Sequence, residues 1–219
     1  SRGLGDVYKR QLIDQFSAIH KSVNHVQRQL GLEESTYINV KKAVGGSVGP
    51  TLKRLFNDVE LETTLPIFKE HFEKVMMDEV FVLPGVLELL DTLKADHIQM
   101  AVLTNKIGSH ARSTLKHLKI DCFFDCTLGA EDTPYRKPSP QFTEHILNSL
   151  NANISETCFI GDSPFDWETG VSVSMPVYLV ATGTHSVSDL KRATNSDFIY
   201  SDIYALAENI FNYKLSNNE

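Results

Sequence analysis

Hydrophobic positions in the first third of the chain recur at helical spacing. In the stretch 14–30 the apolar side chains fall on one helical face: Phe16, Ile19, Val23, Val26 and Leu30. Gly31 then supplies a stop signal, so the stretch predicts an amphipathic helix. Residues 33–80 show no strand pattern, and further helices are predicted around residues 37–44, 51–57 and 64–78. We therefore expect a small all-helical unit over residues 12–80, including its flanking linkers.

The rhythm changes after residue 85, where short apolar runs begin to alternate with amphipathic helices. The strands are predicted at residues 98–103, 124–128, 157–160, 177–181 and 198–200. The helices are predicted at residues 86–95, 107–118, 140–150, 165–173 and 202–211. Alternating β and α elements of this kind favour a parallel sheet covered by helices. We therefore expect a Rossmann-like α/β core domain over residues 81–219, with the helical unit inserted near its start.

The opening residues 1–11, SRGLGDVYKRQ, have neither a strand pattern nor a starting Met. The string resembles the translation of a transposase adapter used in preparing sequencing libraries. We therefore expect residues 1–11 to be an adapter artefact and the natural sequence to continue from Leu12. The alternative is a genuine, unusually basic N-terminus.

Composition narrows the range of partners. The 219 residues are 42% hydrophobic and 22% charged, which is typical of a globular protein that buries a proper core. The net charge of -7, without a basic cluster, argues against nucleic acid or an anionic membrane as the main partner and favours a small molecule. No apolar run is long enough to span a membrane or to form a secretory signal, so we expect a cytoplasmic protein. The three cysteines contain no CxxC pair and are expected to be core thiols.

Polar side chains stand directly after two of the predicted strands, where ligands of open parallel sheets bind. Thr104 and Asn105 follow one apolar run, and Asp162 and Asp166 follow another. Between them, Lys137 precedes a predicted helix N-terminus, which is a favourable place to hold an anion. A hydroxyl with neighbouring backbone N–H groups suits a phosphoryl oxygen, and an acidic pair suits a hard divalent cation.

Each of these residues also has an ordinary structural interpretation. A Thr after a strand is commonly a turn residue, an isolated Lys is commonly a solvated surface charge, and Asp162 or Asp166 could cap the helix near Pro164. The joint pattern is more informative, because three polar sites at the carboxyl ends of the strands of one sheet would together bind an anion and supply a metal ligand.

These segments resemble the haloacid dehalogenase-like hydrolase superfamily. The matching motifs read VLTNK, YRKPSP and FIGDSPFD, and the stretch LPGVLELLDTLK resembles the family's entry into its core domain after a helical cap. Within the superfamily the chain is most similar to the phosphoglycolate phosphatase-like branch. The resemblance implies a Rossmann-like core with a small helical cap inserted after the first strand. The glycine-rich loop 45–50 resembles the family's cap loop, which closes over the site; the alternative is an ordinary connector between helices.

The family's opening motif, a strand ending in Asp-x-Asp-Gly-Thr, is missing from the chain. Counting back from Leu12 places the nucleophile at Val7 and the acid/base Asp at Lys9, both within residues 1–11, and Asp6 is one residue out of register. We therefore expect the first core strand to be absent, the chain to be poorly stable because its sheet has unpaired inner edges, and catalysis to be lost.

The resemblance implies the following chemistry for a natural protein that carries the family's opening motif in place of residues 1–11. An aspartate would attack the phosphorus of a small phosphate monoester and form an aspartyl-phosphate, which water would then hydrolyse. Thr104 and the N–H of Asn105 would hold phosphoryl oxygens, and Lys137 would neutralise charge. Mg²⁺ would bind to Asp162, with Asp166 acting indirectly through water or Ser163.

Three functions therefore fit the sequence. The first is a magnesium-dependent phosphatase of small phosphorylated metabolites, with phosphoglycolate as the favoured substrate. A phosphosugar mutase or pyrophosphatase on the same scaffold is a close alternative. A non-catalytic member that binds a phosphorylated metabolite is the alternative from another class. The exact substrate and the oligomeric state stay open.

Overall fold

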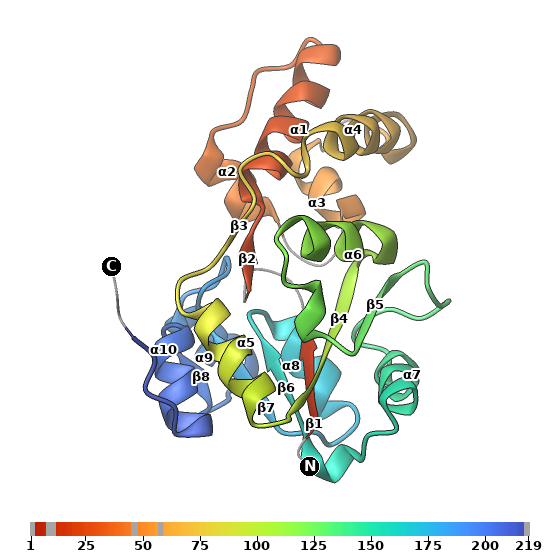
Figure 1. Ribbon diagram of the computed structural model, residues 1–219. Coiled ribbons are helices and arrows are strands. Elements are labelled where there is room, and N and C mark those ends of the chain that lie inside the picture. The colour runs from red at the N-terminus through yellow and green to blue at the C-terminus, as the bar shows by residue number, and fades with distance from the viewer. Residues whose placement is uncertain (1–2, 8–11, 45–47, 57–58, 217–219) are drawn as a thin grey trace. The chain divides into compact units, whose positions relative to one another are not determined.

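The computed structural model of the protein describes residues 3–7, 12–44, 48–56 and 59–216 (Figure 1). Contacts within the chain divide it into two units. The core unit comprises Ser1–Ile13 and Val82–Glu219, and the helical unit comprises Asp14–Phe81. The chain passes between the units along two short strands that pair with each other, β2 (Ile13–Asp14) and β3 (Phe81–Val82).

The described residues of the helical unit form four helices, close to the predicted places. They are α1 (Phe16–Gln29), α2 (Tyr37–Ala43), α3 (Val48–Leu55) and α4 (Leu61–Val75). Their apolar faces meet in one buried cluster: Phe16, Val23, Val26, Val40, Leu52, Phe56 and Phe68. The expected loop 45–50 is wrong at its end, because residues 48–50 form the first turn of α3, a position where Pro50 is tolerated. Residues 45–47 lie outside the described residues.

The core unit is built on a six-stranded parallel sheet in the order β5-β4-β1-β6-β7-β8. The strands are β1 (Gly3–Val7), β4 (Gln99–Ile107), β5 (Cys126–Ala130), β6 (Thr157–Gly161), β7 (Val177–Val180) and β8 (Ile199–Tyr200). The helices are α5 (Val86–Ala95), α6 (Gly108–His117), α7 (Pro140–Leu150), α8 (Pro164–Val171), α9 (Val187–Thr194) and α10 (Ile203–Leu206). Single 3-10 turns at Asp121–Phe123 and Ile154–Glu156 and a π-helical turn at Ala207–Phe211 complete the unit.

Both faces of this sheet are covered, which explains why its strands read as continuous apolar runs. Leu103 on β4 and Phe159 on β6 are buried with the apolar face of α7 in one cluster. Their neighbours along the strands, Val102 and Ile160, point to the opposite face and are buried as well. The prediction of a parallel α/β core from its apolar runs is therefore confirmed.

The expectation that the first core strand is absent is wrong. Gly3–Val7 forms β1 and lies in the centre of the sheet, where it pairs with β4 on one side and β6 on the other (Figure 1). Two facing parallel strands present unpaired N–H and C=O groups, and an extended segment between them satisfies both sets. The unpaired inner edges from which we expected poor stability are therefore filled.

Two further expectations need correction. The sequence patterns did not indicate α9, whose N-terminus is closed by a capping box between Ser186 and Asp189. The cysteines are free thiols, but Cys122 is exposed and Cys126 and Cys158 are only half-buried, so they are not core thiols. Small size and polarizability allow cysteine to occupy such margins.

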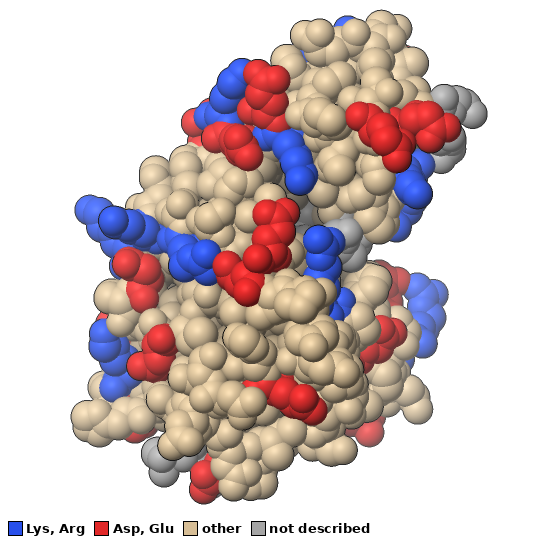
Figure 2. Space-filling view, turned by 90° about the vertical axis from the view of Figure 1, so that its right-hand side faces the viewer, with Lys and Arg blue, Asp and Glu red and all other residues tan. Residues whose placement is uncertain are grey.

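Figure 2 shows how charged side chains are distributed over one face of the molecule. On the face drawn in Figure 2, basic and acidic side chains are interspersed over the surface. Among the described residues, no helix is both long enough and apolar enough to cross a membrane.

A close backbone approach between two glycines fixes the ends of β4 and β5. A Cβ atom added at Gly129 would lie 2.4 Å from the Cα atom of Gly108, which is backbone and cannot rotate away. Overpacking of this kind typically costs about 1–3 kcal/mol. Glycine is therefore required at this point of the core unit.

We expect Gly129→Ala to lower the free energy of unfolding by about 1–3 kcal/mol, measured by urea denaturation. Gly49→Ala is the matched control, because a Cβ atom there meets only a side-chain methyl of Leu61 at 3.4 Å and alanine favours helix. The control should be unchanged or slightly stabilised. Equal stability of the two variants would contradict the close approach.

Candidate functional site

Thr104 lies where β4 leaves the regular ladder. Leu103 of β4 pairs with Leu128 of β5, but the next pair joins Ile107 to Ala130, so four steps along β4 correspond to two along β5. The intervening residues are released from the regular register, and such irregularities commonly redirect side chains next to a site. Thr104 is fully buried, and its hydroxyl oxygen accepts a hydrogen bond from the N–H of Lys106 at 3.1 Å.

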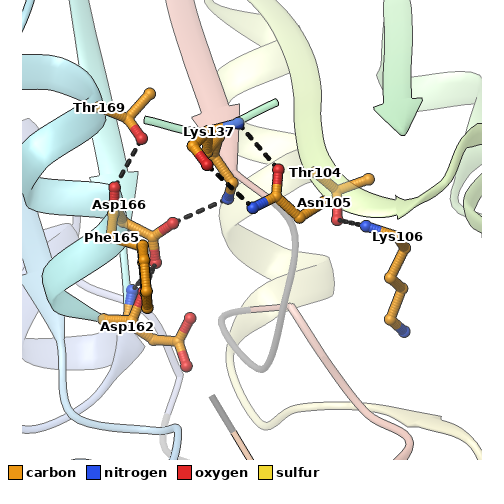
Figure 3. Close-up of polar contacts among 9 residues, drawn as sticks. Thr104, Asn105, Lys106, Lys137, Asp162, Phe165, Asp166 and Thr169 are labelled. Carbon is orange, nitrogen blue, oxygen red and sulfur yellow. Dashed lines mark hydrogen bonds and ion pairs between the residues drawn. The ribbon is translucent and has the colours of Figure 1, made fainter. Parts of the chain in front are cut away.

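A buried ion pair joins Lys137 to Asp166 (Figure 3). The Lys137 Nζ atom donates to Asp166 Oδ1 at 2.8 Å, and the two side chains are only 5% and 3% exposed. Lys137 therefore is not the solvated surface charge that an isolated lysine would be. The ammonium also lies 5.9 Å from the ring centre of Phe159, on β6.

The turn between β6 and α8 supplies the rest of the shell around Asp166. The other carboxylate oxygen, Oδ2, accepts hydrogen bonds from the N–H of Asp162 at 3.0 Å and from the hydroxyl of Ser163 at 2.7 Å. Burial alone raises the pKa of Asp166, but the charge and hydrogen bond of Lys137, with the donors Ser163 and Asp162, lower it below its ordinary value. Asp166 is thus an ionised group with both oxygens engaged.

Asp162 directly follows β6 and is buried, with its carboxylate closely approached by the loop after β7. A Cβ atom added at Gly183 would lie 1.9 Å from Asp162 Oδ2, so only glycine allows the backbone to come this near. In Figure 3 the Asp162 carboxylate points away from the Lys137–Asp166 pair. The two acidic residues therefore face different surroundings.

Asn105 has a contact that the sequence did not reveal. Its Oδ1 accepts a hydrogen bond from the N–H of Lys137 at 2.8 Å, and its Nδ2 donates to the carbonyl oxygen of Lys137 at 3.2 Å (Figure 3). The two residues are 32 positions apart, so no local pattern could have indicated the contact.

The predicted nucleophile position falls within β1. Val7 pairs with Leu103 on β4, the residue immediately before Thr104, and Asp6 pairs with Val102 and Ile160. Only backbone pairing is described for these positions of β1. Lys9, the predicted position of the acid/base, lies outside the described residues.

The site is thus assembled from the ends of β4 and β6, which flank β1, and from the loop before α7. The sequence profile described as "Haloacid dehalogenase-like hydrolase" matches residues 10–180, which contain all five of the residues Thr104, Asn105, Lys137, Asp162 and Asp166. The chain belongs to this hydrolase family.

Several relatives of the chain are phosphoglycolate phosphatases. That of Aquifex aeolicus is 28% identical over 73% of this chain and 75% of its own length. That of Rhodospirillum rubrum is 30% identical over 66% of this chain and 64% of its own length.

Solved structures confirm the fold of this family member. A haloacid dehalogenase-like hydrolase from Streptococcus pneumoniae has a TM-score of 0.83 at 18% identity, covering 92% of this chain and 94% of that one. A hydrolase from Pseudomonas syringae has a TM-score of 0.77 at 20% identity, covering 98% and 100% of the two chains. The α/β fold with its helical insertion is therefore shared.

Few side chains that could bind a divalent cation lie together among the described residues. Among the residues that the structure describes, no group of three His, Cys, Asp or Glu side chains could hold a metal. A phosphate-bound Mg²⁺ needs only one or two protein carboxylates, because phosphate and water supply the other oxygens. Asp162 is a buried carboxylate directly after β6, and both oxygens of Asp166 accept hydrogen bonds from protein groups.

The buried ion pair leads to a pH-dependent prediction. Lys137→Met leaves the Asp166 carboxylate buried without its cation, so the free energy of unfolding should fall by about 3–5 kcal/mol at pH 7. In the unmodified chain the pKa of Asp166 is lowered, so its stabilisation is present above the carboxyl pKa of the unfolded chain and is lost as the pH falls through the folded value. In Lys137→Met, burial without the lysine raises the pKa of Asp166, so the carboxyl becomes protonated as the pH falls and no longer costs a buried charge. The difference in free energy of unfolding between Lys137→Met and the unmodified chain should therefore shrink from pH 7 to pH 4.

Chemical denaturation across this pH range measures the effect. Lys191→Met is the matched control, since Lys191 pairs with Asp197 at the exposed surface and surface pairs contribute little. A deficit of Lys137→Met that is constant with pH would contradict an ionised, buried Asp166.

Proposed function

We propose that this protein binds the phosphate of a small phosphorylated metabolite at the carboxyl ends of β4 and β6. We further propose that the site, with its nucleophile present, hydrolyses phosphate monoesters, with phosphoglycolate as the favoured substrate. Membership of the hydrolase family and the phosphoglycolate phosphatases among its relatives support this choice. The observation that carries it is the buried Lys137 ammonium, held 2.8 Å from Asp166, whose other carboxylate oxygen accepts a hydrogen bond from the N–H of Asp162.

Each residue of this phosphate clamp has a chemical task in this proposal. The hydroxyl of Thr104 and the main-chain N–H of Asn105 hold phosphoryl oxygens, since donors fixed by a folded backbone need no reorganisation when charge develops. Lys137 neutralises the negative charge of the phosphate, and its buried position strengthens that attraction. Asp166 keeps the Lys137 ammonium in place.

Magnesium is the metal we propose, with Asp162 as its protein ligand and Asp166 acting indirectly through Ser163. When bound, the ion would polarise the phosphoryl group and offset its charge. The contribution of this chain is a carboxylate fixed at the strand end, where the N–H of the same residue is bound by Asp166. Gly183 leaves room for that carboxylate.

The covalent step needs carboxylates that the sequence does not carry at the two predicted positions. A carboxylate at position 7 would form the bond to phosphorus while the bond to the ester oxygen breaks, and an acid at position 9 would give that oxygen its proton. Water would then hydrolyse the aspartyl-phosphate. With Val7 and Lys9 in their place, we propose that the chain binds phosphate but turns substrate over poorly.

A restored variant tests this proposal. Val7→Asp combined with Lys9→Asp should release phosphate from small monoesters in the presence of Mg²⁺ at least about 10³-fold faster than the unmodified chain, because removal of a nucleophile costs several orders of magnitude. Phosphate release under steady-state conditions gives the rates, and calorimetry gives the affinity of both proteins for inorganic phosphate.

Asp6→Asn in the restored variant is the control, because Asp6 is out of register with the predicted nucleophile. Its rate of phosphate release should equal that of the restored variant. Asp162→Asn in the restored variant should instead remove the stimulation of phosphate release by Mg²⁺. Equal rates for the unmodified and restored chains would refute the assignment of position 7. Failure of both to bind phosphate would refute the function.

A further inference from the structure

The loop that carries Lys137 is held by the side chain of Asn105, which lies in β4. Asn105 satisfies both main-chain polar groups of Lys137, accepting from its N–H and donating to its carbonyl oxygen. Buried backbone groups require such partners, and within a loop they have no ladder to supply them. One amide thus fixes the backbone of the residue whose ammonium belongs to the phosphate clamp.

The irregular part of β4 makes this contact possible. Asn105 lies between Leu103 and Ile107, within the stretch of β4 that is out of regular register with β5. A residue in a regular ladder directs its backbone groups to neighbouring strands and its side chain to a face of the sheet. Here the carboxamide of Asn105 instead reaches the loop before α7 (Figure 3).

A second anchor holds the beginning of the same loop. Arg112 on α6 forms two hydrogen bonds to the carboxylate of Asp132, at 2.8 and 2.9 Å, and Asp132 also accepts from the N–H of Gly129 at 2.8 Å. The hydrogen bonds from Arg112 lower the pKa of Asp132 and outweigh the opposing effect of its burial, so the carboxylate stays ionised. Both anchors come from β4 or from the helix that follows it.

Fixing the backbone matters because the Lys137 side chain is long. A lysine has about 2 kcal/mol of rotamer entropy, and its four-carbon stem can point the ammonium in many directions. Asp166 holds the ammonium at one end of this stem, and a fixed Cα atom holds the other end, so the two restraints together determine where the ammonium lies. Misplacement of a catalytic group by about 1 Å can cost about 10²-fold in rate.

We infer that Asn105 is a positioning residue, whose side chain acts on phosphate through the backbone of Lys137 and not by direct contact. This inference rests on the proposed function. It is compatible with the main-chain N–H of Asn105 holding a phosphoryl oxygen, because the side chain and the N–H are separate groups.

Hydrogen exchange tests the structural part without any need for activity. In Asn105→Ala the amide of Lys137 loses its acceptor, so its exchange should accelerate by at least about tenfold. Asn153→Ala is the matched control, because the Asn153 carboxamide likewise accepts from a backbone N–H, that of Ser155 at 3.1 Å, at a place remote in sequence from the clamp. The control should leave exchange at Lys137 unchanged. Unchanged exchange in Asn105→Ala would overturn the inference.

A double-mutant cycle tests how Asn105 reaches the phosphate. Asn105→Ala should weaken binding of inorganic phosphate by about tenfold in the unmodified background and have almost no effect in the Lys137→Met background. Equal weakening in both backgrounds would overturn the inference, because it would mean a direct contact. Circular dichroism first verifies that each variant is folded. If Lys137→Met does not fold, the hydrogen exchange of the Lys137 amide in Asn105→Ala decides whether Asn105 is a positioning residue.

The two proposals fail in different ways. Absence of phosphate binding by the unmodified chain would refute the proposed function and the effect on phosphate that we assign to Asn105. Faster exchange at Lys137 would still show that Asn105 holds its backbone. Phosphate binding that is insensitive to Asn105→Ala would overturn the inference alone.

Discussion

The ion pair between Lys137 and Asp166 is the constraint on which the site depends. Removing two charges from water is costly, and the cost is offset only when the remaining hydrogen-bonding capacity is satisfied. Asp166 meets this condition with donors from Lys137, Ser163 and the N–H of Asp162. Because these groups come from a loop and from the turn after β6, the pair couples two segments that are far apart in the sequence. Its value lies in the geometry that it specifies more than in net stability.

Close packing around the two carboxylates follows from that constraint. A Cβ atom at Gly161 would lie 2.2 Å from the Cβ atom of Asp166, and one at Gly183 would lie 1.9 Å from Asp162 Oδ2. Backbone can approach a carboxylate this closely only where no side chain intervenes. The backbone at these glycines therefore lies against the acidic groups and restricts their positions. The Asn105 carboxamide restrains the backbone of Lys137 by hydrogen bonds. A rigid support of this kind is what a site needs if its charges are to act on a small anion.

Most of the core could be predicted from the sequence because each buried strand is a short apolar run with a helical pattern after it. Thr104, Asn105 and Asp162 became candidates because they are polar positions at the ends of such runs, and Lys137 because it precedes a helix N-terminus. The role of the Asn105 side chain could not, since it depends on a contact across 32 residues. The helix α9 was missed because it has only two buried residues, Leu190 and Thr194, although its capping box was a usable signal.

The strand β1 shows the limit of local patterns most clearly. Residues 3–7 have no strand signature, and their placement follows from the open hydrogen-bonding groups of β4 and β6 on either side. Tertiary context regularly overrides intrinsic strand preference in this way. An extended segment is sufficient to complete the sheet, whereas the chemistry depends on which side chains that segment carries. The pairing of the sheet is therefore complete whatever side chains β1 carries.

The distinction between strand pairing and chemistry has a physical origin in how the proposed site is built. The proposed phosphate clamp would take its groups from the end of β4, from the loop before α7 and from the turn after β6, and an ion pair and hydrogen bonds join these three segments. Interactions that hold a phosphate equally in the bound substrate and in the transition state give affinity without accelerating the reaction. The nucleophile would add the interaction that exists only along the reaction path, and it would come from β1. Under the proposed function, the groups at the ends of the flanking strands would bind phosphate and β1 would supply the chemical step, so a change in β1 would remove the reaction and leave those groups in place.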